Sequence, residues 1–96
     1  MIQELETNFI GVGDVKGFIF NQIKVTKKGY IYLVESEGTT HYEIFLRKIT
    51  PVCIDFENRI YSETDFKVKY PKQKDFGIWA WSTKSLTKAN EFLSNF

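Results

Sequence analysis

Apolar and polar residues alternate along the first half of the chain with the period of two that is typical of β-strands. Three runs rich in β-branched and aromatic residues span 16–26, 30–36 and 40–49. KKG and EGT separate them, and each contains a glycine that can adopt positive φ. The pattern predicts two successive hairpins of an antiparallel meander.

The same alternation assigns the side chains of this meander to two faces. In the second strand, one face carries Tyr30, Tyr32 and Val34 and the other carries Ile31 and Leu33. In the third strand, one face carries Tyr42, Ile44 and Leu46 and the other carries Phe45 and Ile49. Both faces are therefore apolar. A sheet with one solvated face would alternate more cleanly, so the second face is expected to be covered as well or to be a binding surface.

Beyond Pro51 the pattern is less regular. Residues 51–65 are expected to form a connection that four apolar side chains anchor against the core, namely Ile54, Phe56, Ile60 and Tyr61. A short strand follows at 66–70 and ends at Pro71. Its alternation directs one set of side chains inward and the lysines outward, with Phe66, Val68 and Tyr70 against Lys67 and Lys69.

Residues 75–82, DFGIWAWS, are apolar at almost every position. Alternation would place Phe76, Ile78 and Ala80 on one side and Trp79 and Trp81 on the other. The segment is predicted to be a strand that is buried on both faces.

The C-terminal residues 84–96 show helical spacing instead. Ser82 or Ser85 can cap a helix N-terminus. Apolar residues then recur at Leu86, Ala89, Phe92 or Leu93, and Phe96, with Lys84, Lys88 and Glu91 on the opposite face. Residues 1–14 form an N-terminal strand or extended arm, since Gly11 and Gly13 would break a helix.

These elements predict an α+β fold: an antiparallel β-sheet meander of about four to six strands with one C-terminal α-helix packed on it. The 96 residues suit a single small domain over 1–96. With 43% hydrophobic and 26% charged residues and no apolar run of membrane-spanning length, the chain is expected to be soluble and not to bind membranes. A lone cysteine and no signal-peptide pattern favour the cytoplasm.

Two glycine motifs superficially resemble a protein kinase, namely D-F-G at 75–77 and GVGDVKG at 11–17. The glycines of the second motif have the wrong spacing, and the other kinase parts need a far longer chain. Gly11, Gly13 and Gly17 are therefore expected at turns and bulges.

Catalytic chemistry has little support in the sequence. His41 and Cys53 could meet as a nucleophile and base, but a buried cysteine and a hydrogen-bonded histidine explain them more simply. One cysteine and one histidine fall short of a zinc site. The close carboxylates Asp55 and Glu57, or Glu63 and Asp65, are typical of a solvated face. We predict a protein that is not an enzyme, without catalytic, metal or cofactor-binding residues.

Basic residues with interleaved aromatics indicate a candidate binding strand. The residues concerned are Lys67, Lys69, Tyr70, Lys72 and Lys74, to which the meander adds Arg47 and Lys48. Lysines for phosphates and rings for bases are what a single-strand nucleic-acid binder needs. The same alternation also protects an edge strand from aggregation, and the net charge is only +1.

Aromatic residues make up 17% of the chain, and tyrosine and tryptophan are common in protein interfaces. The candidate aromatic interface consists of Tyr30, Tyr32, Tyr42, Trp79 and Trp81. An equally good explanation is that these rings fill a thin core.

Three segments, VKGFIFNQI, YIYLVESEGTTHYEIFLRKI and YPKQKDFGIWAWSTKSLTKANEF, carry a resemblance. They resemble a set of small phage and mobile-element proteins from AT-rich bacterial genomes that share V-K-G-F-x-F, H-Y-E-x-F and F-G-x-W-A-W followed by a helix. The match runs from Val15 to Phe92, and no functional residues carry over with it.

The resemblance implies a phage or mobile-element accessory protein that binds a host protein. The partner would be a nuclease or ribonucleoprotein. In the most specific form of this hypothesis, the protein inhibits a defence nuclease, as an anti-CRISPR protein does. The alternative hypothesis is a small module that binds RNA or single-stranded nucleic acid.

Overall fold

The computed structural model describes residues 2–96 and has the predicted α+β architecture. Eight strands, two short 3₁₀ helices and one α-helix occur in these residues. Their bounds are β1 (Ile2–Gln3), β2 (Asn8–Ile10), η1 (Gly13–Val15), β3 (Ile19–Val25), β4 (Gly29–Ser36), β5 (Thr39–Leu46), β6 (Ile49–Asp55), β7 (Ile60–Val68), η2 (Gln73–Asp75), β8 (Ala80–Thr83) and α1 (Leu86–Ser94). The N-terminal residues contribute two short strands and η1 rather than one continuous arm.

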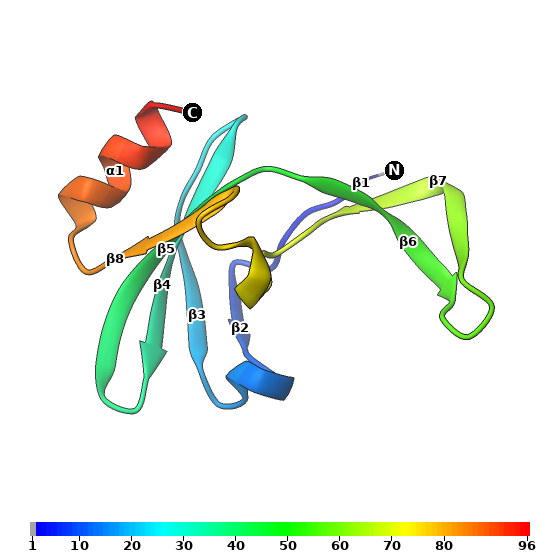
Figure 1. The fold of residues 1–96 in the computed structure, drawn as a ribbon, viewed down its shortest axis with the longest axis horizontal. Coiled ribbons are helices and arrows are strands. Elements are labelled where there is room, and N and C mark those ends of the chain that lie inside the picture. The colour runs from blue at the N-terminus through cyan, green and yellow to red at the C-terminus, as the bar shows by residue number, and fades with distance from the viewer. Residues whose placement is uncertain (1) are drawn as a thin grey trace.

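The larger sheet has the order β2-β3-β4-β5-β8 and is antiparallel throughout (Figure 1). The predicted meander is confirmed as β3, β4 and β5. Glu37 and Gly38 join β4 to β5 with φ of 47° and 81°, the positive values that a tight two-residue hairpin turn requires. Gly29, at the other turn, does not use positive φ; a Cβ there would lie 2.4 Å from the carbonyl oxygen of Phe45.

Helix α1 covers one face of this sheet. Ile31 and Ile44 pack there against Ala89 and Leu93, and all four side chains are buried. The Ser85 hydroxyl caps the helix by accepting a hydrogen bond from the Lys88 N–H at 3.3 Å. The predicted stripe is thus confirmed at its centre, whereas Leu86 is 42% exposed.

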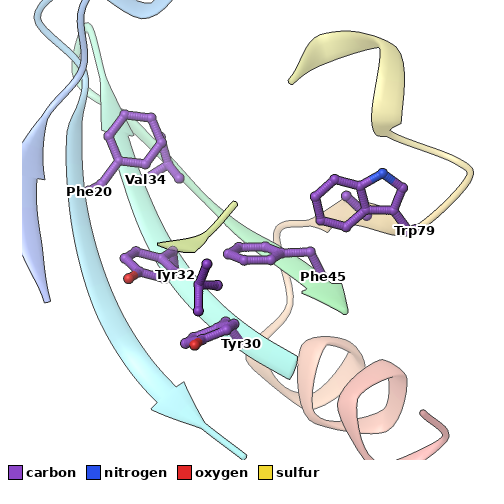
Figure 2. Packing of buried hydrophobic residues seen from close by; sticks show 8 residues of the cluster. Phe20, Tyr30, Tyr32, Val34, Phe45 and Trp79 are labelled. Atoms are coloured by element: carbon purple, nitrogen blue, oxygen red, sulfur yellow. The ribbon is translucent and has the colours of Figure 1, made fainter. Parts of the chain in front are cut away.

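An aromatic core lies on the other face (Figure 2). Tyr30, Tyr32 and Val34 lie together on it, as the alternation within β4 predicts. Phe45 of β5 joins them, and Phe9 and Tyr70 pack over them from outside the meander. The second face is therefore covered. Leu46 also packs on this side, contrary to the prediction, because β5 ends at this residue and the chain turns toward β6.

The prediction of a strand over 75–82 is wrong for its first half. Asp75 ends η2, and its carboxylate accepts a hydrogen bond from the Lys72 N–H at 2.8 Å. Gly77 then adopts φ of 92°, so the chain turns and β8 begins only at Ala80. The turn interrupts the alternation: Ile78 points into solvent, while Trp79 and Ala80 pack on the same core. D-F-G builds a turn in this protein.

A second, smaller sheet has the order β1-β7-β6. The prediction of an irregular connection over 51–65 is wrong, because β6 and β7 form a hairpin there. Pro51 lies within β6 and does not end it; β6 is an edge strand, where the missing N–H of proline is tolerated. We call residues 49–66 the distal hairpin and the larger sheet with α1 the body.

Candidate interaction surfaces

The distal hairpin projects away from the body (Figure 1), and the principal contacts of its strands are with each other and with β1. Its apolar side chains are therefore left without a core. Phe56 is 84% exposed, Ile54 66%, Tyr61 50% and Ile60 49%. These four residues were expected to anchor the segment against the core, and that prediction is wrong because the hairpin extends beyond the body.

A bulge gives the distal hairpin a bend. Pro51 pairs with Phe66 but Cys53 pairs with Tyr61, so Val52 lies opposite residues 62–65 of β7. The Ser62 Oγ accepts hydrogen bonds from the N–H groups of Thr64 and Asp65, at 3.2 and 2.8 Å. Because these bonds hold the extra residues in a compact turn, β7 changes direction there, as Figure 1 shows.

Charge is unevenly divided between the two regions. The distal hairpin carries Asp55, Glu57, Glu63 and Asp65 against Arg59 alone, a net charge of −3. Since the whole chain has a net charge of +1, the remaining residues carry +4. The exposed apolar side chains therefore stand in an acidic setting.

One of these carboxylates forms hydrogen bonds within the distal hairpin. The Asp55 carboxylate accepts hydrogen bonds from Asn58 Nδ2 at 2.8 Å and from the N–H groups of Glu57 and Asn58. These bonds, that of the Asn58 side chain first, lower the pKa of Asp55 below its usual 3.8. Asp55 thus closes the turn between β6 and β7, while its charge still contributes to the acidic setting.

The structure brings together some of the predicted basic residues. Lys48 and Lys69 lie over the Trp79 ring, with their Nζ atoms 5.4 and 6.0 Å from its centroid. Lys72, at the N-cap of η2, and Lys74, within η2, are exposed in the segment that leads to this ring. The sequence predicted the basic residues but not that two separate segments converge on one indole.

Arg47 and Lys67 lie apart from that cluster. Arg47 forms an ion pair with Glu4, and this carboxylate also accepts the Tyr30 hydroxyl hydrogen bond at 2.9 Å. Lys67 lines a shallow groove of about 350 Å³ between β7 and the N-terminal segment, together with Glu4 and Glu6. Glu4 therefore neutralises Arg47, whereas Lys67 only shares a groove with two carboxylates.

Tyr70 points inward and packs against the aromatic core, as the alternation predicts, so its ring is not free to stack on a ligand. Its ring contacts Phe9, Phe20 and Phe45, with centroids 4.7–5.6 Å apart. Its hydroxyl donates a hydrogen bond to Glu43 Oε1 at 2.7 Å. Burial, and next the charge of Glu43, raise the pKa of Tyr70 above its usual 10.0.

Three of the five candidate interface rings are also buried. Tyr30, Tyr32 and Trp79 are 1%, 0% and 6% exposed, because the second face of the sheet is covered (Figure 2). An aromatic interface built on these three is therefore wrong. Burial raises the pKa of Tyr32 to about 12. Tyr42 and Trp81 are half-buried beside α1, where Trp81 stacks on Phe92.

The groups considered for catalysis lie apart. His41 Nε2 is 2.8 Å from Glu43 Oε2 in the body, whereas Cys53 is half-buried in the distal hairpin. Over residues 2–96, no group of three or more histidine, cysteine or acidic side chains could hold a metal ion. In the same part of the chain, no helix is long and apolar enough to cross a bilayer.

No protein-family model, curated protein or solved structure matches this chain. Function is therefore inferred from the surfaces described above and from the sequence. Two stand out: the apolar, acidic distal hairpin and the lysine cluster over Trp79.

Proposed function

We propose that this protein is a non-catalytic binding module that docks onto another protein through the distal hairpin. The observation that carries the proposal is the exposure of Phe56 and Ile54, at 84% and 66%, on a projecting hairpin. A two-stranded hairpin without a core of its own is marginal in water, so these side chains gain most when a partner covers them.

The charge of the distal hairpin defines the chemistry of the partner. Its net charge of −3 is complementary to a protein surface where lysine and arginine residues border an apolar cleft. Extension of the sheet along the free edge of β6 is disfavoured, since Pro51 interrupts the row of N–H donors on that strand. Side chains, rather than the strand edge, therefore make the contact.

A phage or mobile-element setting, as the sequence resemblance implies, makes the partner a host protein. A defence nuclease fits the proposed chemistry, because a protein that binds nucleic acid exposes basic residues. The specific form of our proposal is that docking of the distal hairpin inhibits such a nuclease without chemistry of its own.

The test is affinity capture from a host lysate treated with nuclease, using the tagged wild type and Phe56→Ala. Ile10→Ala is the matched control, because Ile10 is 68% exposed on the body. We expect a stoichiometric protein that survives nuclease treatment, is retained by Ile10→Ala and is at least tenfold depleted with Phe56→Ala. Equal capture by all three proteins, or capture only of species lost with nuclease, would overturn the proposal.

Inhibition is tested separately with the purified partner. If the partner cleaves nucleic acid, the wild type and Ile10→Ala should suppress cleavage at concentrations where Phe56→Ala does not. Undiminished cleavage in the presence of saturating wild type contradicts the inhibitory form while leaving docking itself intact.

A further inference from the structure

Lys48 and Lys69 are held together by the junction between the two sheets. Lys48 lies between β5 and β6, and Lys69 directly follows β7. The Lys69 N–H donates a hydrogen bond to the Lys48 carbonyl oxygen at 2.8 Å, which fixes the two chain segments side by side. Both ammonium groups therefore stay near the same indole, that of Trp79.

Neither lysine of this pair forms an ion pair with a carboxylate among the described residues. The described residues form two ion pairs, His41 with Glu43 and Arg47 with Glu4, and neither includes a lysine of the cluster. The Asp75 carboxylate accepts hydrogen bonds from the Lys72 N–H and the Trp79 side chain, and its charge attracts Lys69 and Lys74. It therefore offsets part of the positive charge of the cluster. Lys72 and Lys74 add two further exposed ammonium groups.

Bringing four like charges together is unfavourable, and the single carboxylate of Asp75 offsets only part of the repulsion. The indole offsets only part of this repulsion, since an exposed cation–π contact contributes about 0.5–1 kcal/mol. The cluster therefore has unused capacity for a ligand with several negative charges.

The neighbouring rings define what kind of anion fits. Trp79 is 6% exposed and Tyr70 is packed in the core, so neither offers a free face on which a base could stack. Lysine is a flexible point charge that binds phosphate without sequence information. A ligand here would be held through its phosphates alone.

We propose that Lys48, Lys69, Lys72 and Lys74 form a site for the phosphodiester backbone of nucleic acid, bound without regard to sequence. The site is separate from the distal hairpin and does not depend on the function proposed above. With it, the protein contacts a nucleic acid at the lysine cluster and a protein at the distal hairpin.

The first test measures binding of a labelled single-stranded oligonucleotide by fluorescence anisotropy over a range of salt concentrations. We compare the wild type with the double variant Lys48→Gln/Lys69→Gln. Lys84→Gln/Lys88→Gln is the matched control, because it removes the same charge from the exposed face of α1 and its flank. A thermal melt of each variant checks that it is folded.

We expect the slope of log K against log salt to become shallower by about 1.4 in the Lys48/Lys69 variant, about 0.7 for each phosphate that a lysine no longer neutralises. The slope for Lys84→Gln/Lys88→Gln should equal that of the wild type. Equal losses in both variants would show diffuse attraction to net charge and overturn the site, as would the absence of salt-sensitive binding by the wild type.

Trp79 supplies a second, local readout. In a Trp81→Phe background it is the only tryptophan, and phosphate binding should draw the ammonium groups away from its ring and change its emission. The change should be absent in the Lys48/Lys69 variant. Phe56→Ala should bind oligonucleotide like the wild type, so the failure of one proposal is distinguishable from the failure of the other.

Discussion

The body and the distal hairpin are both antiparallel sheet, yet aromatic rings are buried in the first and exposed in the second. In the body, seven rings form one connected set of contacts, which runs through Phe9, Phe20, Tyr30, Tyr32, Phe45, Tyr70 and Trp79. In the distal hairpin, Phe56 and Tyr61 are exposed and take part in no ring contact among residues 2–96. The aromatic excess of the sequence therefore belongs mostly to the core.

This difference in burial indicates which aromatic residues bear on function. A buried ring stabilises the fold whether or not the protein has a partner, so its presence says nothing about binding. An apolar side chain on a projecting hairpin has no such structural reason, because no core lies beneath it. The few exposed rings of the distal hairpin are thus more informative than the many rings of the body.

The sharpest test of this comparison is the same substitution in each region. Phe45→Ala should lower the free energy of unfolding by about 3–5 kcal/mol, because Phe45 is fully buried against four other rings. Phe56→Ala should change it by less than about 0.5 kcal/mol, since its ring is solvated. Denaturant unfolding of both variants provides the measurement. A loss of several kcal/mol in Phe56→Ala would mean that the distal hairpin packs against the body.

A tyrosine from each region gives the next contrast. Tyr70→Phe removes the donor to Glu43 and should cost about 1–3 kcal/mol at pH 8, whereas Tyr61→Phe, half-exposed in the distal hairpin, should be neutral. Denaturant unfolding at that pH measures both. Equal costs for the two variants would contradict the contrast between the regions.

The cost of Tyr70→Phe should also depend on pH. The folded pKa of Tyr70 is raised above 10.0, so its stabilising effect is complete below pH 10 and is lost as the pH rises further. Phenylalanine has no proton to lose, so the gap between the wild type and Tyr70→Phe should narrow from pH 8 to pH 11. A gap that stays constant would contradict the assigned pKa shift.

Several features of the body could be predicted from sequence because they depend on local periodicity. The faces of β4 follow from strict alternation, and the turn at Glu37 and Gly38 follows from residues that tolerate positive φ. The cap at Ser85 was one of two predicted positions for the same reason. In each case the sequence pattern that predicts the feature lies within the same few residues that form it.

The predictions that are wrong concern features that depend on contacts between residues far apart in the sequence or on turns that interrupt the alternation. Pro51 stops a strand unless that strand lies at a sheet edge, and the edge position of β6 depends on its pairing with β7. In D-F-G, the Asp75 cap and the positive φ of Gly77 override the apparent alternation. The lysine cluster could be predicted only in part, because its geometry requires the bond between Lys69 and Lys48 across two strands.

The smallest predicted effect concerns the bend in the distal hairpin. Ser62→Ala removes the acceptor for the Asp65 N–H, an exposed bond, and should change global stability by less than about 1 kcal/mol. Hydrogen exchange at that amide should nevertheless become faster, because the bulge loses the group that holds it. Ser94→Ala is the matched control, since it removes an exposed serine hydroxyl from the end of α1 and should leave exchange in the distal hairpin unchanged. If the bend positions Phe56 for docking, Ser62→Ala should also weaken partner capture, which links the local geometry of the distal hairpin to its proposed role. Unchanged exchange at Asp65 would mean that the bulge is held by the strand pairing alone.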